Sequence, residues 1–208
     1  EFSNDSKLQT IEKNAFNEIP IKSIIIPSQV TFIGRNAFGS CRKLEQIIIQ
    51  EDSQLKIIEK NAFKNTLIDK IQIPSEVKFI GENIFESCKN IKEIEIPIDS
   101  KLEFIGDNCF ESTLIENISI PSQITQINKG TFYSCMDLKK FKFTIDSKLQ
   151  VINKNAFCYT LIDRITIPVN VQIIGSHAFY GCQRLFYVRF HDDSKLKIII
   201  LNFNHNTA

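Results

Sequence analysis

The chain of 208 residues lacks the features on which membrane insertion or nucleic-acid binding would depend. No stretch approaches the roughly 18 consecutive apolar residues of a membrane-spanning helix, and the first residues have neither the basic flank nor the apolar run of a signal peptide. The formal net charge is only +1, whereas nucleic-acid binders typically carry a strong basic excess. We therefore expect no nucleic-acid partner and no direct membrane insertion through this part of the chain.

Motifs for catalysis and metal binding are also missing. The sequence has no glycine-rich phosphate loop, no Gly-x-Ser-x-Gly and no paired Cys or Cys/His spacing of the kind that zinc sites use. The three histidines, His177, His191 and His205, do not recur with a serine, cysteine or carboxylate at the spacing of a triad or metal site. We expect a protein that is not an enzyme and needs no cofactor and no metal.

What the sequence does contain is a repeat of 47 residues. Each repeat divides into coils of 23 and 24 residues, and one phenylalanine per coil recurs at alternating spacings of 22 and 25 residues. Coils of this size cannot bury their own apolar residues, so they stack on their neighbours as a solenoid. The aspartates that mark the 47-residue period and the phenylalanines are Asp5, Asp52, Asp99, Asp146, Asp193, Phe16, Phe38, Phe63, Phe85, Phe110, Phe132, Phe157 and Phe179.

A stack of coils is one continuous structural unit, so we expect a single domain over residues 1–208. Because the chain begins and ends within a repeat, we also expect it to be part of a longer array. The predicted coils are 5–27, 28–51, 52–74, 75–98, 99–121, 122–145, 146–168 and 169–192, with a partial ninth at 193–208.

The last part of each coil predicts a β-strand. In the second coil, Leu44, Ile47 and Ile49 place apolar residues on one face of a short run, which is typical of a half-buried strand. Eight such strands with the same direction must form a parallel sheet. A proline ends five of them, because its fixed φ and missing N–H stop the ladder. These prolines are Pro27, Pro74, Pro97, Pro121 and Pro168.

The first part of each coil predicts a turn back into the core. An apolar pair such as Val30 and Ile33 should point inward, and a corner residue with a permissive backbone should follow it. An Asn-Ala-Phe segment then predicts a helical turn on the outer side, with the phenylalanine buried in a spine and the asparagine bonded to backbone carbonyls. The corner residues are Gly34, Gly81, Gly106, Gly175, Asn128 and Asn153.

Four of the six cysteines occupy one position of the repeat, at intervals of 47 residues. Two coil steps separate them by roughly 10 Å, which exceeds the Cα spacing of about 7 Å that a disulfide tolerates. We expect buried structural thiols, and a bridge between neighbouring coils is the alternative. The column consists of Cys41, Cys88, Cys135 and Cys182, with Ile19, Thr66, Thr113 and Thr160 in the coils between; Cys109 and Cys158 lie elsewhere.

The order Leu-x-x-Ile-x-Ile-Pro, Val-x-x-Ile-Gly and Asn-Ala-Phe-x-x-Cys resembles the BspA-like class of leucine-rich repeat over residues 5–192. The resemblance implies an α/β repeat solenoid, a right-handed coil with a parallel sheet on its concave face and short helical turns or loops on its convex face. Family members are typically surface proteins that bind host proteins or other cells. The resemblance therefore implies that this protein binds other proteins in an adhesion-like role, at the cell surface or in secreted form.

An intracellular leucine-rich repeat scaffold in the cytoplasm is the alternative to that role. Free thiols favour the cytosol, whereas the glycosylation sequons at Asn4 and Asn117 favour the cell surface, although Asn117 lies on a predicted strand. The ligand expected in either case is a protein or glycoprotein. Uncapped sheet edges at the ends, beside the outward Ile25 and Ile48, also predict self-association.

Outward residues of the eight strands form the expected docking surface. The first five strands carry a formal charge of −2 and the last three +4. Solvated sheet faces commonly carry charge, but exposed aromatics beside arginine are typical of binding hot spots. The candidate partner-binding residues on the concave face are Lys139, Lys140, Lys142, Arg164, Phe186, Tyr187 and Arg189.

Overall fold

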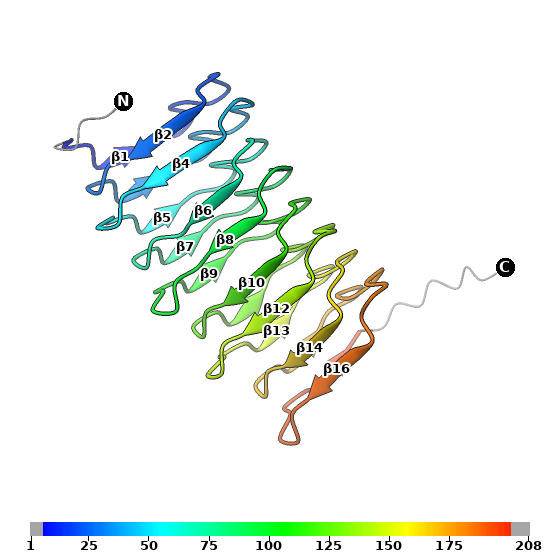
Figure 1. Ribbon diagram of the computed structural model, residues 1–208. Coiled ribbons are helices and arrows are strands. Elements are labelled where there is room, and N and C mark those ends of the chain that lie inside the picture. Colours follow the sequence, from blue (N-terminus) through cyan, green and yellow to red (C-terminus); the bar gives the residue numbers. More distant parts are fainter. Residues whose placement is uncertain (1–5, 201–208) are drawn as a thin grey trace.

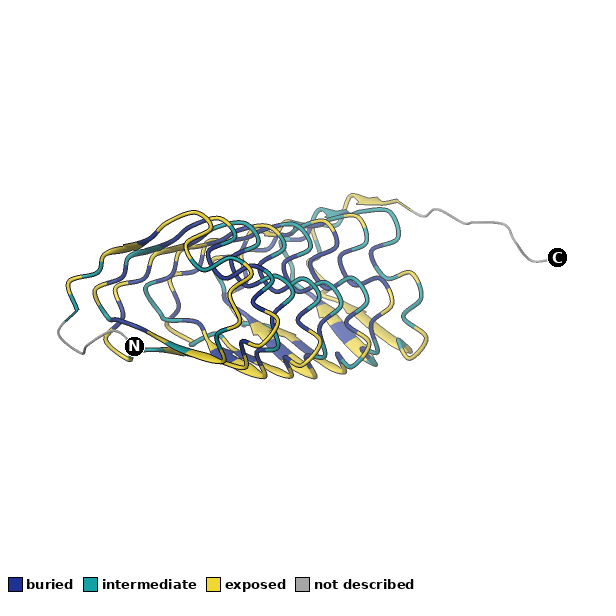
Figure 2. Cartoon of the chain, turned by 90° about the horizontal axis from the view of Figure 1, so that it is seen from above, coloured by how far each residue is buried: buried dark blue, intermediate teal, exposed yellow. Residues whose placement is uncertain are grey.

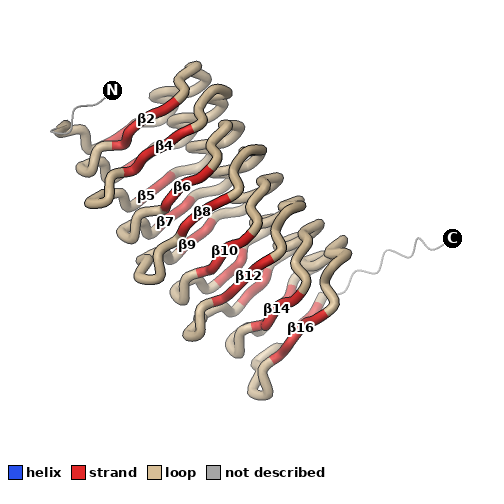
Figure 3. Tube along the Cα trace, viewed as in Figure 1, coloured by secondary structure: helices blue, strands red, loops and turns tan. Residues whose placement is uncertain are grey.

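A computed structural model describes residues 6–200 as one elongated stack of coils (Figure 1). Strands alternate with loops and turns along the whole of this range, which contains no helix (Figure 3). Asn4, His205 and the second half of the partial ninth coil, residues 201–208, lie outside the described residues. Each coil carries a longer strand on one side, the long-strand face, and a two-residue strand on another, the short-strand face.

The eight predicted strands of the long-strand face are present and parallel, which confirms the parallel solenoid. Apolar residues of these strands point inward and alternate with exposed ones, as a strand with one buried face requires. The strands are β2 (Ser23–Ile26), β4 (Gln46–Ile49), β6 (Lys70–Gln72), β8 (Glu93–Glu95), β10 (Asn117–Ile120), β12 (Lys140–Phe143), β14 (Arg164–Ile167) and β16 (Tyr187–Phe190).

Pairing of the long strands follows the alternation of coil lengths. Where equivalent residues are 23 apart, three residues pair in register in β6 with β8, and four pair in the other steps, as in β2 with β4 or β10 with β12. Where they are 24 apart, β8 and β10 meet only at Asn117 and Glu93, and β4 and β12 belong to different sheets from β6 and β14. An extra residue in one strand of a pair disrupts the ladder locally. The long strands are therefore divided into groups of two, four and two: β2 with β4, β6 to β12, and β14 with β16.

The short strands form a second set of parallel sheets that the sequence did not predict. Only their second residue points into the core, such as the fully buried Ile33 and Ile58, while the first faces outward. The expected inward-pointing apolar pair is confirmed, since Val30 and Ile33 are both fully buried; Ile33 lies in β3, and Val30 precedes it. The strands are β1 (Thr10–Ile11), β3 (Phe32–Ile33), β5 (Ile57–Ile58), β7 (Phe79–Ile80), β9 (Phe104–Ile105), β11 (Gln126–Ile127), β13 (Val151–Ile152), β15 (Ile173–Ile174) and β17 (Ile198–Ile199).

The expected helical turns on the outer side are wrong. Each Asn-Ala-Phe segment forms successive turns in which two residues four apart have positive φ, for example Asn61 at 60° and Asn65 at 57°. A right-handed helix cannot include such residues. Instead, the segment bonds to the next coil through three backbone N–H groups per step, as Asn61, Phe63 and Asn65 do at 2.9–3.2 Å. We call this side of the stack the turn column.

The corner glycines also have a different role from the one expected. Gly34, Gly81, Gly106 and Gly175 do not have positive φ. They are required because the backbone of the preceding coil lies against them: a Cβ at Gly106 would come within 2.5 Å of both Gly81 C and Glu82 N. The left-handed conformation that favours glycine occurs in the turn column, at Gly130 and Gly181.

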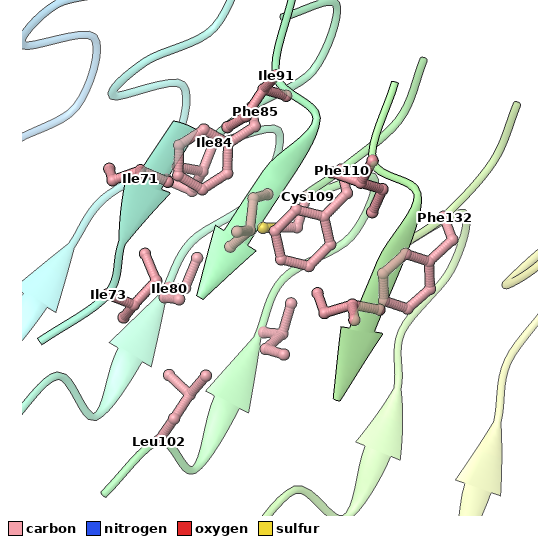
Figure 4. Packing of buried hydrophobic residues seen from close by; sticks show 14 of the residues in the cluster. Ile71, Ile73, Ile80, Ile84, Phe85, Ile91, Leu102, Cys109, Phe110 and Phe132 are labelled. Atoms are coloured by element: carbon pink, nitrogen blue, oxygen red, sulfur yellow. The ribbon is translucent and has the colours of Figure 1, made fainter. Parts of the chain in front are cut away.

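The predicted phenylalanine spine is present in the interior. Successive rings stack with centroids 5.2–5.9 Å apart, and the six inner rings are fully buried. Figure 4 shows Phe85, Phe110 and Phe132 following one another from coil to coil. Each buried aromatic removes roughly 150–250 Å² from water, so the spine is a major source of stability. Seen from above, the buried residues line the inside of each coil (Figure 2).

The sequence predicted that the turn-column asparagines would bond to backbone carbonyls. Instead, the side chains of these asparagines bond to one another in the first four coils. The side-chain amides of Asn36, Asn61 and Asn83 each donate to the side-chain oxygen of the preceding asparagine at 2.9–3.1 Å. These bonds link the first four coils, beginning at Asn14. Asparagine is suited to this position because it tolerates positive φ better than most residues.

The cysteine column has the buried character that the repeat predicts, and the six cysteines are not bridged in this structure. Cys88 Sγ donates to the backbone oxygen of Phe63 at 3.1 Å, and Thr66 Oγ1, from the coil between, bonds to the same oxygen at 2.9 Å. Thr113 and Cys135 repeat this arrangement around the backbone oxygen of Phe110. Burial raises the pKa of Cys88 to about 11 and that of Cys135 to about 12.

Candidate protein-binding face

All seven residues proposed from the sequence to bind a partner are exposed on the long-strand face. Lys140 and Lys142 lie in β12 on either side of the buried Phe141, and this alternation directs both ammonium groups outward. Lys139, just before the strand, is also exposed. Three lysines on one strand give this part of the face a local positive charge that no other strand matches.

The aromatic and arginine residues lie one and two long strands away, on β14 and on or just before β16. Phe186 and Tyr187 are 74% and 52% exposed, and Arg164 Cζ lies 5.9 Å from the centroid of the Phe186 ring. Arg164 is the register partner of Tyr187, and Asp163 Oδ1 accepts a contact from Arg164 Nε at 3.4 Å. The guanidinium therefore lies over the ring of Phe186, an arrangement that cation–π attraction stabilises.

The exposure of β16 extends to residues that would otherwise be core. Val188 and Phe190 are each 40% exposed, whereas their register partners Ile165 and Ile167 are almost fully buried. Among the described residues, β16 pairs only with β14. Val188 and Phe190, whose register partners point into the core, are therefore exposed at this end of the stack, while Phe186 and Tyr187 are exposed on the long-strand face.

The structure does not bring all the predicted residues into one contact. No pairing joins β12 to β14, because the step between them has 24 residues, and the register partners of Lys140 and Lys142 are Asn117 and Ser119 of β10. The face therefore has two parts, a lysine strand and an aromatic–arginine pair. At the opposite end, Ile25 and Ile48 are exposed and paired in register.

A pocket of about 630 Å³ lies over β6 and β8, but it has no catalytic arrangement. Its lining mixes both signs of charge and offers neither a histidine nor a cysteine; the residues are Asp69, Lys70, Lys89, Asn90, Lys92, Glu93 and Leu114. Within residues 6–200, no three His, Cys, Asp or Glu side chains are grouped as a metal site requires. The same range has no helix capable of crossing a bilayer.

The described histidines are not placed for catalysis. His177 has a φ of 56° in the turn column, and its ring packs edge-on against Tyr180 with centroids 5.4 Å apart. His191 is exposed, and its Nδ1 lies 4.0 Å from Asp193 Oδ2. Within residues 6–200, neither histidine ring is hydrogen-bonded to a serine or cysteine side chain.

The sequence reasoning missed an exposed apolar row on the short-strand face. Phe32 is half-buried, and Ile57, Phe79 and Phe104 are 38–40% exposed. Each directly precedes the buried isoleucine of its two-residue strand. The signal was the repetition of an apolar residue at this position in four successive coils, but two-residue strands are too short for an alternation to be recognised.

The comparisons with known proteins agree with this architecture. A family model described as the BspA type leucine-rich repeat region matches residues 9–139 and 56–186. The leucine-rich repeat protein TpLRR of T. pallidum is 22% identical with a TM-score of 0.64, and the match covers 86% of this chain and 72% of that protein. No curated protein was found to match the sequence.

The pneumococcal vaccine antigen PcpA is 19% identical with a TM-score of 0.56, over 96% of this chain. The chain spans only 61% of the length of that antigen. At these identities, the two solved structures show the fold alone, a solenoid of leucine-rich coils.

Proposed function

Because the chain belongs to the family of BspA type leucine-rich repeat proteins, we propose that it is a non-enzymatic module that binds a protein or glycoprotein on a host or other cell through its long-strand face. The observation that carries this proposal is the combination of the lysine strand with the exposed aromatic–arginine pair on one face of the stack. The partner it fits has an acidic surface beside a pocket for an aromatic side chain.

We place the protein at the cell surface or in secreted form. Support comes from the structural relative that is described as a vaccine antigen. The second candidate is an intracellular scaffold for protein–protein interaction, which six unbridged thiols favour, because thiols persist in a reducing compartment. Both candidates use the same face, and they differ in the source of the partner.

Substitutions in the two parts of the face should change the binding kinetics in different ways. Charges at the rim of an interface act mainly on the association rate and are screened by salt, whereas a buried aromatic anchor typically contributes about 2 kcal/mol or more. We therefore expect the double variant Lys140→Glu, Lys142→Glu to slow association, most strongly at low salt. Tyr187→Ala should instead speed dissociation.

These effects can be measured by surface plasmon resonance with a partner selected from an array of host extracellular proteins. Lys154→Glu is the matched control, because Lys154 is exposed but lies at the edge of the turn column. If both long-strand variants bind like the parent while Lys154→Glu abolishes binding, the long-strand face is not the binding surface.

A further inference from the structure

The short-strand face carries an exposed apolar row that neither the core nor the proposed function uses. Phe32, Ile57, Phe79 and Phe104 are consecutive partners in one parallel ladder, and the last two rings stack with centroids 4.8 Å apart. In the following coil, Gln126 takes their position and interrupts the row. The result is a bounded apolar patch across coils two to five, which we call the apolar row.

A charged border runs along one side of the apolar row. It contains one residue from each of the same four coils, in the order Arg35, Lys60, Glu82 and Asp107. Lys60 Nζ is bonded to Glu82 Oε2, so the sign changes at the boundary between coils three and four. That boundary is also the midpoint of the apolar row.

This charge order is self-complementary. An antiparallel two-fold placed at the midpoint would set Phe32 over Phe104 and Ile57 over Phe79 of a second copy. The same operation would set Arg35 over Asp107 and Lys60 over Glu82, so every contact along this border joins opposite charges. A two-fold interface requires such a patch, because each residue meets the symmetry equivalent of another residue of the same patch.

We propose that the short-strand face of coils two to five binds a second copy of this chain as an antiparallel two-fold dimer. The long-strand faces of the two copies then point away from each other. Each remains free for a ligand, and the dimer is bivalent. Bivalency can raise the avidity for a cell surface by about 10²–10⁴-fold without a new contact.

The opposite border of the apolar row limits the strength of the dimer. Lys56 and Lys78 lie there, and the two-fold would place Lys56 of one copy near Lys78 of the other. Glu76 lies close to both and offsets part of this charge; its bond to Lys101 and the nearby Lys56 and Lys78 lower its pKa. Four coils span only about 19 Å, so the contact is smaller than the usual 800 Å² or so per partner. We expect a weak, reversible dimer.

Charge reversal tests whether the partner is a second copy, because only then do both substituted residues meet each other across the interface. By sedimentation velocity over a concentration series, Arg35→Asp and Asp107→Arg should each weaken the dimer by about tenfold, and the double variant should recover it. Phe79→Ser should abolish dimerisation. Circular dichroism should show that each monomer keeps its fold. A small loss of thermal stability is expected for Asp107→Arg, because Asp107 Oδ1 accepts a bond from Lys129 N at 3.2 Å, and for Phe79→Ser, because Phe79 stacks on Phe104.

The variant Lys56→Gln distinguishes binding of a second copy from binding of a different, acidic protein. It should tighten a self-dimer, because it removes a like-charge contact, whereas it would weaken binding of an acidic protein. The proposal is wrong if the parent stays monomeric at all concentrations or if the double charge variant does not recover. It is also wrong if a dimer survives Phe79→Ser and is lost on Ile48→Ser instead, since the long-strand face would then be the contact.

Discussion

At the scale of single residues, the threonine–cysteine column shows how a repeat satisfies its buried polar groups. Thr66 and Cys88 come from successive coils, yet both donate to the backbone oxygen of Phe63. A buried carbonyl has two lone pairs, so both bonds can form at once. The alternation of threonine and cysteine could be read in the sequence, but the shared carbonyl could not, because it depends on how two coils stack.

Replacement of Cys88 by threonine should be tolerated and should change the pH dependence of stability. Threonine occupies this position in the neighbouring coils, so we expect a change of less than about 1.5 kcal/mol at neutral pH. The pKa of Cys88 is raised from 9.0 to about 11 by burial, so its contribution to stability is complete below pH 9 and is lost as the pH rises to 11. The threonine variant has no thiol at this position and therefore lacks this loss of stability.

Urea unfolding at a series of pH values measures this difference. Between pH 9 and 11, the free energy of unfolding should fall more steeply for the parent than for Cys88→Thr. Parallel curves would show that the thiol ionises as easily in the folded chain as in the unfolded one.

At the scale of secondary-structure elements, predictability depended on element length and on backbone conformation. The long strands were predicted because three apolar positions in a row of six define their period, as Leu44, Ile47 and Ile49 do. The short strands were not predicted, because two residues are too few to define a period. The turn column was misread as helical because Asn-Ala-Phe is compatible with a helix, and the positive φ of Asn61 arises only from stacking.

The asparagine ladder offers a test of the turn column. Asn61→Gly should lose the amide bonds to Asn36 and Asn83 while keeping the φ of 60°, at a cost of about 1 kcal/mol. Asn61→Ala loses the same bonds and must also place a Cβ in the left-handed region, which costs roughly 1–2 kcal/mol more. Gly130 shows that glycine is accepted at this position.

Chemical denaturation of the two asparagine variants should therefore rank glycine above alanine in stability. An alanine variant as stable as the glycine variant would mean that the backbone relaxes out of the left-handed region, and the turn column would not be the rigid ladder described above.

At the scale of the whole molecule, the location of the candidate binding residues followed from the sequence, whereas their grouping did not. Strand alternation sufficed to place Lys140 and Tyr187 on the exposed side of the sheet. The separation of β12 from β14 depends on one extra residue per 47, whose effect on pairing is visible only in three dimensions. The apolar row was not foreseen, because the two-residue strands that carry it define no period in the sequence.

Deletion of residues 52–98 should leave a shorter protein that folds. It removes two complete coils and brings Phe38 and Phe110 to a spacing of 25, which the spine already uses. Because stability in a solenoid is approximately a sum over coils and their interfaces, one cooperative transition should remain, with a smaller m value.

Deletion of residues 52–86 is the matched control, because it removes 35 residues and breaks the register. Urea unfolding followed by circular dichroism should show a cooperative transition only for the in-register deletion. Equal loss of cooperativity in both proteins would contradict the coil boundaries used here.

The uneven pairing of the long strands has a mechanical consequence. The turn column is bonded at each of the seven steps from coil one to coil eight, and the short strands are joined at all but the step between β9 and β11, where β10 and β12 are fully paired. The long-strand sheet opens at two steps, between β4 and β6 and between β12 and β14. The stack should therefore bend like a beam with one compliant side. The long-strand face should therefore change curvature more easily than the sides on which the turn column and the short strands keep the coils aligned.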